Sequence, residues 1–340
     1  MPELPEVHTT VEGLKKVAVG KTILDIWSDF HVSTSHGERD NIKNEKHYKN
    51  LKKLATGAKI EKIERLGKNI LIHLSSGHTI AIHMKMTGHL MYGEYELQKI
   101  SSPVSKNYVP SLSTDKSLLA FSSSRLVSLR KARSGNNFWK PLEEGPLQDP
   151  YNQYIHFVAS LSCGKHLVLS DMRRFASVSI FKSDSIQSHA SLSLLGPDAL
   201  KINIKDFKKR IKEMGKTRPI KTVLLDQEII AGVGNIYSDE ILWKTGVHPL
   251  SLANKIPEIK LSEIYKEMKR ILEFSISNGG DSKSDYRNVF GEKGGFQNFH
   301  KAYGNKGKKC PRNKCSGIIE RIMVKTRSSH FCATHQKLFK

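Results

Sequence analysis

Hydrophobic and polar positions follow two different patterns along the chain, and the change falls near residue 192. Before that point, short segments rich in β-branched residues are separated by Gly or Ser turns. Because successive side chains of a strand point to opposite faces, such segments predict β-strands. The predicted strands cover KIEKIERL (59–66), NILIHL (69–74), HTIAIHM (78–84), HFVASL (156–161) and KHLVLSD (165–171).

From LSLLGPDAL (192–200) onward, apolar residues recur at helical spacing with glycines at the ends of segments. Two stretches interrupt the first half: the polar stretch 29–50, and the Ser- and Pro-rich stretch 100–117, which we interpret as a surface insertion with a poorly ordered tip. The predicted helices cover KDFKKRIKEM (205–214), PIKTVLLDQEI (219–229), NIYSDEILWKTG (235–246) and LSEIYKEMKRILEFSISNGG (261–280).

The net charge of the chain indicates which class of partner the protein binds. The 340 residues include 55 Lys and Arg against 33 Asp and Glu, a formal net charge of +22. Such an excess favours a polyanionic partner, with nucleic acid first and an anionic membrane surface or a plain lysine bias as alternatives. No apolar stretch approaches the ~18 residues of a membrane span, and the N-terminus lacks the basic and apolar regions of a secretory signal.

Cysteines gather at the C-terminus. Cys310 and Cys315 form one pair, and Cys332 and His335 form a second. Two ligand pairs joined by a hairpin-sized segment predict a tetrahedral Cys₃His site for Zn²⁺, with His330 as an alternative fourth ligand and free surface thiols as the other interpretation. The segment 301–327 carries nine Lys and Arg and a single acid, which suits a phosphate backbone, although a solvated basic face explains most of the lysines.

Two further motifs carry chemistry. In GVGNIY, Gly232 and Gly234 permit close backbone approach, and Asn235 begins a helix whose N–H groups can bind phosphate, although a helix-to-helix connection explains the turn as well. The start, MPELPEV, places Glu3 and Glu6 in a strongly basic chain. Alone, these two acids would only complement a helix dipole.

Together, PELPEV, GVGNIY and the terminal two-pair hairpin resemble the formamidopyrimidine-DNA glycosylase/endonuclease VIII family. Leu4 favours the formamidopyrimidine branch, because endonuclease VIII proteins typically have Gly there. The resemblance covers most of the chain and leaves 29–50 and 97–150 unaccounted for. It extends to RLGKNILIHL, HMKMTGHL, SDMRRFAS, LLGPDAL and GGDSKSDYRNVFGEKGGFQNFHKAYG.

The resemblance implies an α+β fold: an N-terminal β-sandwich domain flanked by helices, and a C-terminal helix–two-turn–helix domain with a β-hairpin zinc finger. The implied boundaries are a catalytic domain at 1–190, a hinge at 191–200, a DNA-binding domain with a lesion-recognition loop at 201–300, and a zinc finger at 301–340. It also implies a bifunctional DNA glycosylase and abasic-site lyase of base excision repair, acting on oxidised purines such as 8-oxoguanine and formamidopyrimidines.

The resemblance also assigns the reaction. With Met1 removed, Pro2 becomes a secondary amine, and an α-amino group has a pKa of ~7.7–8.0 against ~10.4 for lysine, so more of it is neutral near pH 7. Pro2 is then the nucleophile, which forms a Schiff base that leads to β,δ-elimination. Glu3 donates a proton to the sugar ring oxygen, Glu6 supports proton handling or positioning, and Lys68 adds a cation.

For DNA binding, the resemblance implies that Met86, Arg173 and Phe175 fill the void left by the extruded base, with core packing as the alternative for Met86 and Phe175. Lys221, Asn235 and Arg327 contact phosphates. The implied partners are one structural Zn²⁺ and double-stranded damaged DNA. A monomer in the bacterial cytoplasm, with no membrane partner, is expected.

The metal hairpin departs from the family pattern. Four residues separate Cys310 from Cys315 where the family usually has two, and His335 replaces the usual fourth Cys. Alternatives stay open: an endonuclease VIII-like enzyme for oxidised pyrimidines, a catalytically inactive damaged-DNA-binding protein, or an RNA-binding protein, which would need stacking aromatics that are not evident. Cys163 is expected to be a buried thiol.

Overall fold

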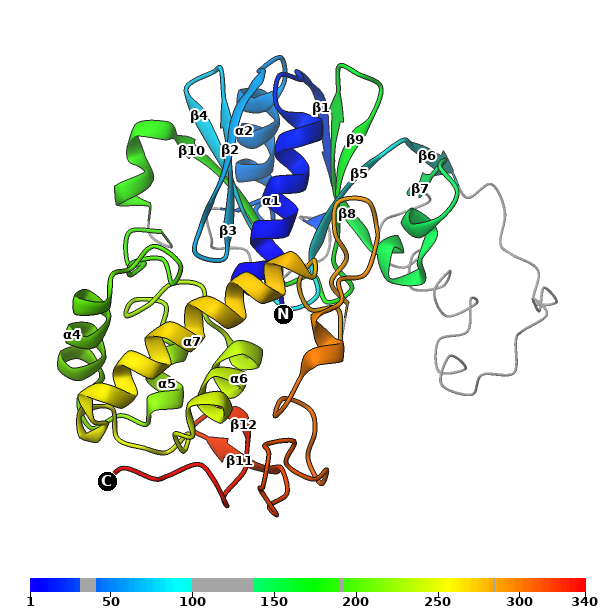
Figure 1. Cartoon of the computed structure of the whole chain (residues 1–340). Coiled ribbons are helices and arrows are strands. Elements are labelled where there is room, and N and C mark those ends of the chain that lie inside the picture. The colour runs from blue at the N-terminus through cyan, green and yellow to red at the C-terminus, as the bar shows by residue number, and fades with distance from the viewer. Residues whose placement is uncertain (31–40, 100–136, 190–191, 284) are drawn as a thin grey trace, which may run out of the picture.

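The computed structural model describes residues 1–30, 41–99, 137–189, 192–283 and 285–340, which gather around two main hydrophobic cores (Figure 1). The N-terminal half contains two antiparallel sheets of four strands, in the orders β1-β8-β9-β5 and β10-β4-β3-β2. The first sheet consists of β1 (Ile23–Ser28), β5 (His89–Gly93), β8 (Ile155–Leu161) and β9 (His166–Ser170). The second consists of β2 (Ile60–Leu66), β3 (Asn69–Leu74), β4 (His78–His83) and β10 (Ser177–Lys182).

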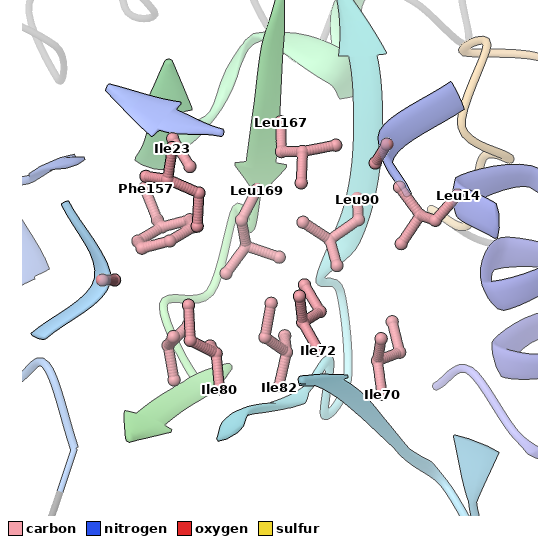
Figure 2. Packing of buried hydrophobic residues seen from close by; sticks show 14 of the residues in the cluster. Leu14, Ile23, Ile70, Ile72, Ile80, Ile82, Leu90, Phe157, Leu167 and Leu169 are labelled. Atoms are coloured by element: carbon pink, nitrogen blue, oxygen red, sulfur yellow. The ribbon is translucent and has the colours of Figure 1, made fainter. Parts of the chain in front are cut away.

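The two sheets face each other across the larger core. Figure 2 shows side chains of β3 and β4 pointing toward those of β1, β5, β8 and β9, so the layers form a sandwich. Helix α1 (Leu4–Ala18) closes one side of this core with Val7, Val11 and Leu14, a spacing that places them on one helical face. Helix α2 (Glu45–Ala55) adds Leu51 and Ala55.

The outer faces of both sheets are partly covered, which explains why strands such as β3 and β8 are buried almost without alternation. Val158 and Val168 pack on the outer side of the first sheet with Trp139, which comes from the ribbon of β6 (Tyr95–Lys99) and β7 (Asn137–Pro141). Leu71 and Ala81 pack on the outer side of the second sheet. Two short 3₁₀ helices, Pro146–Gln148 and Pro150–Gln153, follow the ribbon.

The second core belongs to four helices: α4 (Ile204–Gly215), α5 (Ile220–Leu225), α6 (Asn235–Thr245) and α7 (Glu258–Ser277). A small two-stranded sheet, β11 (Glu320–Val324) with β12 (Arg327–Phe331), packs beside α6 near the C-terminus (Figure 1). Within the described ranges, no helix has both the length and the apolar character needed to cross a bilayer.

Several contacts join the two halves, and three of them involve α1, β2 and the β2–β3 turn. Leu4, the first residue of α1, is buried in the helical core, and its N–H donates to the carbonyl of Gly232 at 3.1 Å. The guanidinium of Arg65 on β2 binds Asp198 in a bidentate pair, with N–O distances of 2.5 and 3.1 Å, and both side chains are buried. The turn between β2 and β3 lies against Ala231.

The predicted α+β architecture is confirmed, and each predicted strand and helix overlaps one in the structure. Helix α2 was not predicted, because its N-cap residue lies in the polar stretch 29–50. The side chain of that residue, Asn44, accepts a hydrogen bond from the N–H of His47 at the start of the helix. The insertion predicted at 100–117 lies outside the described residues, and the domain boundaries stay predictions. Cys163 is exposed, which contradicts the buried thiol expected, because it lies in the turn between β8 and β9.

Replacing Arg65 with Ala should strongly destabilise the protein, because it leaves the buried carboxylate of Asp198 unpaired. Breaking such a pair costs about 3–5 kcal/mol of unfolding free energy, measured by urea denaturation. Lys62→Ala is the matched control: Lys62 lies on the same strand in an exposed pair with Glu64, worth less than about 1 kcal/mol. Similar losses for the two variants would contradict a joining role for Arg65.

Candidate active site

The N-terminus of the chain lies where the two halves meet (Figure 1). Pro2 is buried, and Glu3 is the N-cap residue of α1. The carboxyl group of Glu3 lies against Gly234, where an added Cβ would stand 2.3 Å from the carboxyl carbon. Gly232 has φ +116 and would meet Leu4 at 2.5 Å. These two glycines of GVGNIY therefore allow α1 to begin directly on the N-terminus of α6.

Glu3 is held by one carboxylate oxygen only. Oε1 accepts from the N–H of Ile236 in the first turn of α6 at 2.9 Å, whereas Oε2 is buried without a hydrogen-bond partner among the described residues. Burial raises the pKa of Glu3, and the cation of Lys68 and the α6 N–H oppose that rise. The residue therefore combines a tendency to hold a proton with one oxygen that is free to donate it.

Glu6 is held on both oxygens. Oε2 accepts from the N–H of Glu3 at 2.7 Å, and Oε1 accepts from the Tyr237 hydroxyl at 2.5 Å and the N–H of Asp281 at 2.7 Å. Burial, reinforced by the negative charge of Glu3, raises the pKa of Glu6 to about 7. Glu6 thus fixes the first turn of α1 against α6 and the segment after α7, and it titrates near neutral pH.

Lys68 reaches the same place from the β2–β3 turn. Gly67 has φ +57, which a two-residue hairpin requires at its first turn position, and Lys68 follows at the tip. The buried ammonium of Lys68 donates to the carbonyl of Val233 at 2.9 Å. Burial lowers the pKa of Lys68, the charges of Glu3 and Glu6 oppose this, and the charge of Arg327 lowers it further. Arg327, though distant in sequence, therefore lies within electrostatic range of Lys68.

Met86, Arg173 and Phe175 lie on two neighbouring loops that the structure ties together. The Thr87 hydroxyl donates to Asp171, and the N–H of Arg173 donates to the Thr87 hydroxyl at 3.1 Å. The guanidinium of Arg173 lies over the ring of Phe175, 4.5 Å from its centroid, and both side chains are exposed. Exposure of this stacked pair argues against core packing for Phe175.

Lys221 has a different position from the one predicted. Its ammonium is fully buried and donates to the Asn235 carbonyl, the Ser238 hydroxyl and the Asp239 carboxylate at 2.9, 2.8 and 2.7 Å. With all three ammonium hydrogens engaged, Lys221 cannot contact a phosphate in this arrangement. It instead holds the first turn of α6. Asn235 begins that helix, and its side-chain oxygen has no partner among the described residues.

Asp239 and Glu240 are two of the buried acids that sequence reasoning missed. Asp239 accepts from Lys221, the Ser329 hydroxyl and the N–H of His330, and so joins α6 to β12. The Glu240 carboxylate accepts three backbone N–H groups of residues 301–303. The sequence carries a signal for them in NIYSDEILWKT, a helix with two acids but no polar face. The helix lacks a polar face because α6 is buried on nearly all sides, so both acids are buried with it.

The four predicted metal ligands come together. One ligand atom from each of Cys310, Cys315, Cys332 and His335 lies within 4.8 Å of the others. Nδ1 of His335 points at the thiols, 3.4 Å from the Cys310 sulfur, while its Nε2 lies 3.0 Å from the Trp243 carbonyl oxygen. A ring whose second nitrogen is held by a carbonyl suits a metal-binding histidine. His330 is not the fourth ligand, because its Nδ1 faces Asp239 at 3.2 Å.

Comparison with known proteins finds the same family that the sequence motifs resemble, over most of the chain. A family model described as formamidopyrimidine-DNA glycosylase N-terminal domain matches residues 1–178, and one described as formamidopyrimidine-DNA glycosylase H2TH domain matches residues 195–287. The chain is 30% identical to the formamidopyrimidine-DNA glycosylase of Lactobacillus acidophilus over 100% of both chains. It is 29% identical to that of Streptococcus mutans, over 99% of this chain and 100% of the relative.

Solved structures of the Lactococcus lactis glycosylase share the fold. A complex with DNA containing an abasic site has a TM-score of 0.70 at 25% identity and covers 98% of this chain and 99% of that chain. A complex with DNA containing Fapy-dG has a TM-score of 0.69 at 25% identity, covering 98% and 100%. Fold and site thus define a DNA glycosylase with an H2TH domain. The chain belongs to the formamidopyrimidine-DNA glycosylase family.

The raised pKa of Glu6 should appear in the pH dependence of stability. Between the ordinary value of 4.5 and about 7, the folded state binds this proton more tightly than the unfolded state does. The unfolding free energy should therefore fall by up to about 3 kcal/mol as pH rises through that window. Glu6→Gln should lack this decline in urea denaturation at several pH values.

Glu12→Gln, in an exposed pair with Lys15, serves as the control and should keep the wild-type pH profile. Parallel profiles for wild type and Glu6→Gln would show that Glu6 does not titrate in this range.

Proposed function

We propose that the protein is a bifunctional DNA glycosylase and abasic-site lyase that excises oxidised purines from duplex DNA. The observation that carries this proposal is the buried cluster of Pro2, Glu3, Glu6 and Lys68, in which Glu3 keeps one carboxylate oxygen free. The names of the relatives and the DNA in the Lactococcus lactis complexes support formamidopyrimidine lesions as substrates.

The reaction requires an amine nucleophile, which Pro2 supplies once Met1 is removed. The Pro2 nitrogen attacks C1′ of the damaged nucleotide, and the bond from C1′ to the base breaks, so that the base leaves with the electron pair and takes up the proton that the Pro2 nitrogen loses. Glu3 donates a proton from Oε2 to the sugar ring oxygen, which opens the ring and leaves an iminium between Pro2 and C1′. Burial, which raises the pKa of Glu3 and so favours its protonated form, supports this role.

The iminium acidifies the neighbouring sugar protons, and this leads to strand cleavage. Loss of a proton from C2′ expels the 3′ phosphate, and a second elimination expels the 5′ phosphate. The cation of Lys68, and that of Arg327 within electrostatic range of it, suit the negative phosphates that leave. Glu6 holds the first turn of α1, and its raised pKa suits proton transfer near neutral pH.

Base extrusion leaves a gap in the duplex. The stacked pair of Arg173 and Phe175 is exposed beside Met86, and the Asp171–Thr87 contact holds both loops in register. An aromatic ring and an apolar chain suit unstacked neighbouring bases, and a guanidinium suits the orphaned partner base. We assign these three side chains to the gap, and Asn235 and Arg327 to the flanking phosphates.

The metal that fits the Cys₃His cluster best is a single structural Zn²⁺, since thiolate and imidazole donors in a closed set of four suit it. Its ligands, Cys310, Cys315, Cys332 and His335, would hold the β11–β12 hairpin and thereby Arg327. Reduced thiols support a location in the bacterial cytoplasm. One chain carries every proposed site residue, which supports action as a monomer.

The nucleophile is tested by trapping. Borohydride should link the protein covalently to abasic DNA, whereas a variant with residues retained before Pro2 should not be trapped, because its nitrogen is an amide. Denaturing electrophoresis measures the covalent product. Equal trapping of the blocked protein would move the nucleophile to a lysine, with Lys68 as the candidate.

Glu3→Gln is the companion variant in the same assay. It should bind lesion DNA but fail to release the base, because it cannot donate the proton. A loss of binding as large as the loss of turnover would contradict the role of Glu3.

The β11–β12 hairpin should contribute to DNA binding without taking part in the chemistry. Cys332→Ser, or zinc removal by a chelator, should weaken DNA binding severely, because a site this small draws its folding free energy from the metal. Arg327→Ala should keep zinc and lower affinity across sequences. The slope of log K against log salt should fall by about 0.9, the contribution of one phosphate contact.

Lys266→Ala is the charge-matched control for Arg327→Ala, because it removes one exposed cation from α7. It should leave the salt slope unchanged. If Arg327→Ala loses glycosylase activity while its slope of log K against log salt is unchanged, Arg327 takes part in the chemistry and not in binding the DNA backbone.

A further inference from the structure

The segment after α7 crosses from one half of the molecule to the other and back. Figure 1 shows it in orange, running along the N-terminal sheets before it descends toward the β11–β12 hairpin. Its two ends belong to the helical half: the N–H of Phe296 donates to the carbonyl of Gly280 at 3.1 Å, and Phe296 is buried in the helical core. We call residues 281–283 and 285–296 the crossing segment.

The middle of the crossing segment is built into the N-terminal half. Val289 is buried in the core of the sandwich, and its carbonyl accepts from the N–H of Tyr92 at 2.7 Å. Gly13 of α1 makes room for it, because a Cβ there would stand 2.4 Å from Val289. Gly291, at φ +82, lies so close to Pro146 that an added Cβ would stand 2.7 Å from the Pro146 backbone. The segment is thus fixed at three points of the N-terminal half.

Arg287 is the strongest polar anchor of this docking. Its side chain is 1% exposed, and Nε and Nη2 both donate to Oδ2 of Asp149, at 3.2 and 3.0 Å. Nη1 donates to the Tyr286 carbonyl at 2.9 Å, and the guanidinium lies 5.1 Å from the ring centroid of Tyr151. A buried guanidinium with its charge paired by a bidentate contact resists displacement. The reaction proposed above makes no use of it.

The part of the crossing segment before Arg287 lies over the catalytic cluster. The N–H of Asp281 donates to Oε1 of Glu6, and the Tyr286 hydroxyl donates to the Glu6 carbonyl at 3.0 Å. Between these contacts, Asp285 is half-buried and within electrostatic range of the N-terminal amino group and Arg173. Asp281, Asp285 and Tyr286 therefore border the space beside Pro2 where an extruded base has to lie.

We propose that Arg287 is a positioning residue for the lesion base, because its contact with Asp149 fixes the wall that the crossing segment forms beside the catalytic cluster. This inference rests on the proposed glycosylase function. An abasic site has no base to be positioned. The contact should therefore matter for base excision and not for strand cleavage at a preformed abasic site, although both reactions use Pro2.

The test measures both reactions on the same protein samples. Arg287→Met keeps the apolar stem and removes the guanidinium. Asp149→Asn keeps Oδ1, which accepts from the N–H of Tyr151, and replaces the oxygen that binds Arg287. Each variant should lower kcat/KM for excision from duplexes containing formamidopyrimidine or 8-oxoguanine by about tenfold, since small misplacements of a reacting group cost rate steeply. Cleavage of abasic duplex should stay within about twofold of wild type.

Three comparisons make the result decisive. The double variant should lose no more excision than either single variant, because both remove one contact, and Arg287→Lys should recover part of the excision rate. Arg270→Met, which breaks an exposed pair with Glu267 on α7, should change neither reaction. An equal fall in excision and abasic cleavage, or unchanged excision, would overturn the proposal. A wild-type protein inactive in both reactions would overturn the proposed function instead.

Discussion

The whole arrangement depends on one contact: the carboxylate of Glu3, at the start of α1, accepts from a free N–H at the start of α6. Two helix N-termini, each with a positive partial charge, thereby meet at one buried acid. The contact is possible because Gly234 has no side chain where the Glu3 carboxyl group lies. It joins the sandwich to the helical half at the place where Pro2 lies. Packing of the two halves against each other therefore also brings the residues of the site together.

The other groups of the site are oriented by backbone atoms of the same turn. Lys68 donates to the carbonyl of Val233, and Leu4 donates to that of Gly232. The burial that follows disfavours both charged forms, so the acids tend to hold protons and Lys68 tends to lose one. Shifts in these directions bring proton donors and acceptors toward the range in which they exchange protons at neutral pH.

Sequence reasoning predicted five strands (β2, β3, β4, β8 and β9), four helices (α4 to α7) and the grouping of the metal ligands, because periodicity, glycines and ligand pairs are local signals. It placed Lys221 on a phosphate, and this failed because the burial of a lysine depends on what packs around α5 and α6. The sequence had already placed His335 in the second ligand pair, and the contact of His330 with Asp239, which lies far from both in sequence, removes the alternative. Helix α2 was missed because most of its residues are polar, and only Leu51 and Ala55 are buried.

Asp239 has a mechanical consequence. One carboxylate binds the ammonium that holds the first turn of α6 and also binds two successive residues of β12, Ser329 and His330. The hairpin that carries Arg327 and the helix N-terminus that binds Glu3 are therefore connected through Asp239 of α6. Under the proposed function, contact of Arg327 with the DNA backbone and the orientation of Glu3 are linked through Asp239 and the first turn of α6.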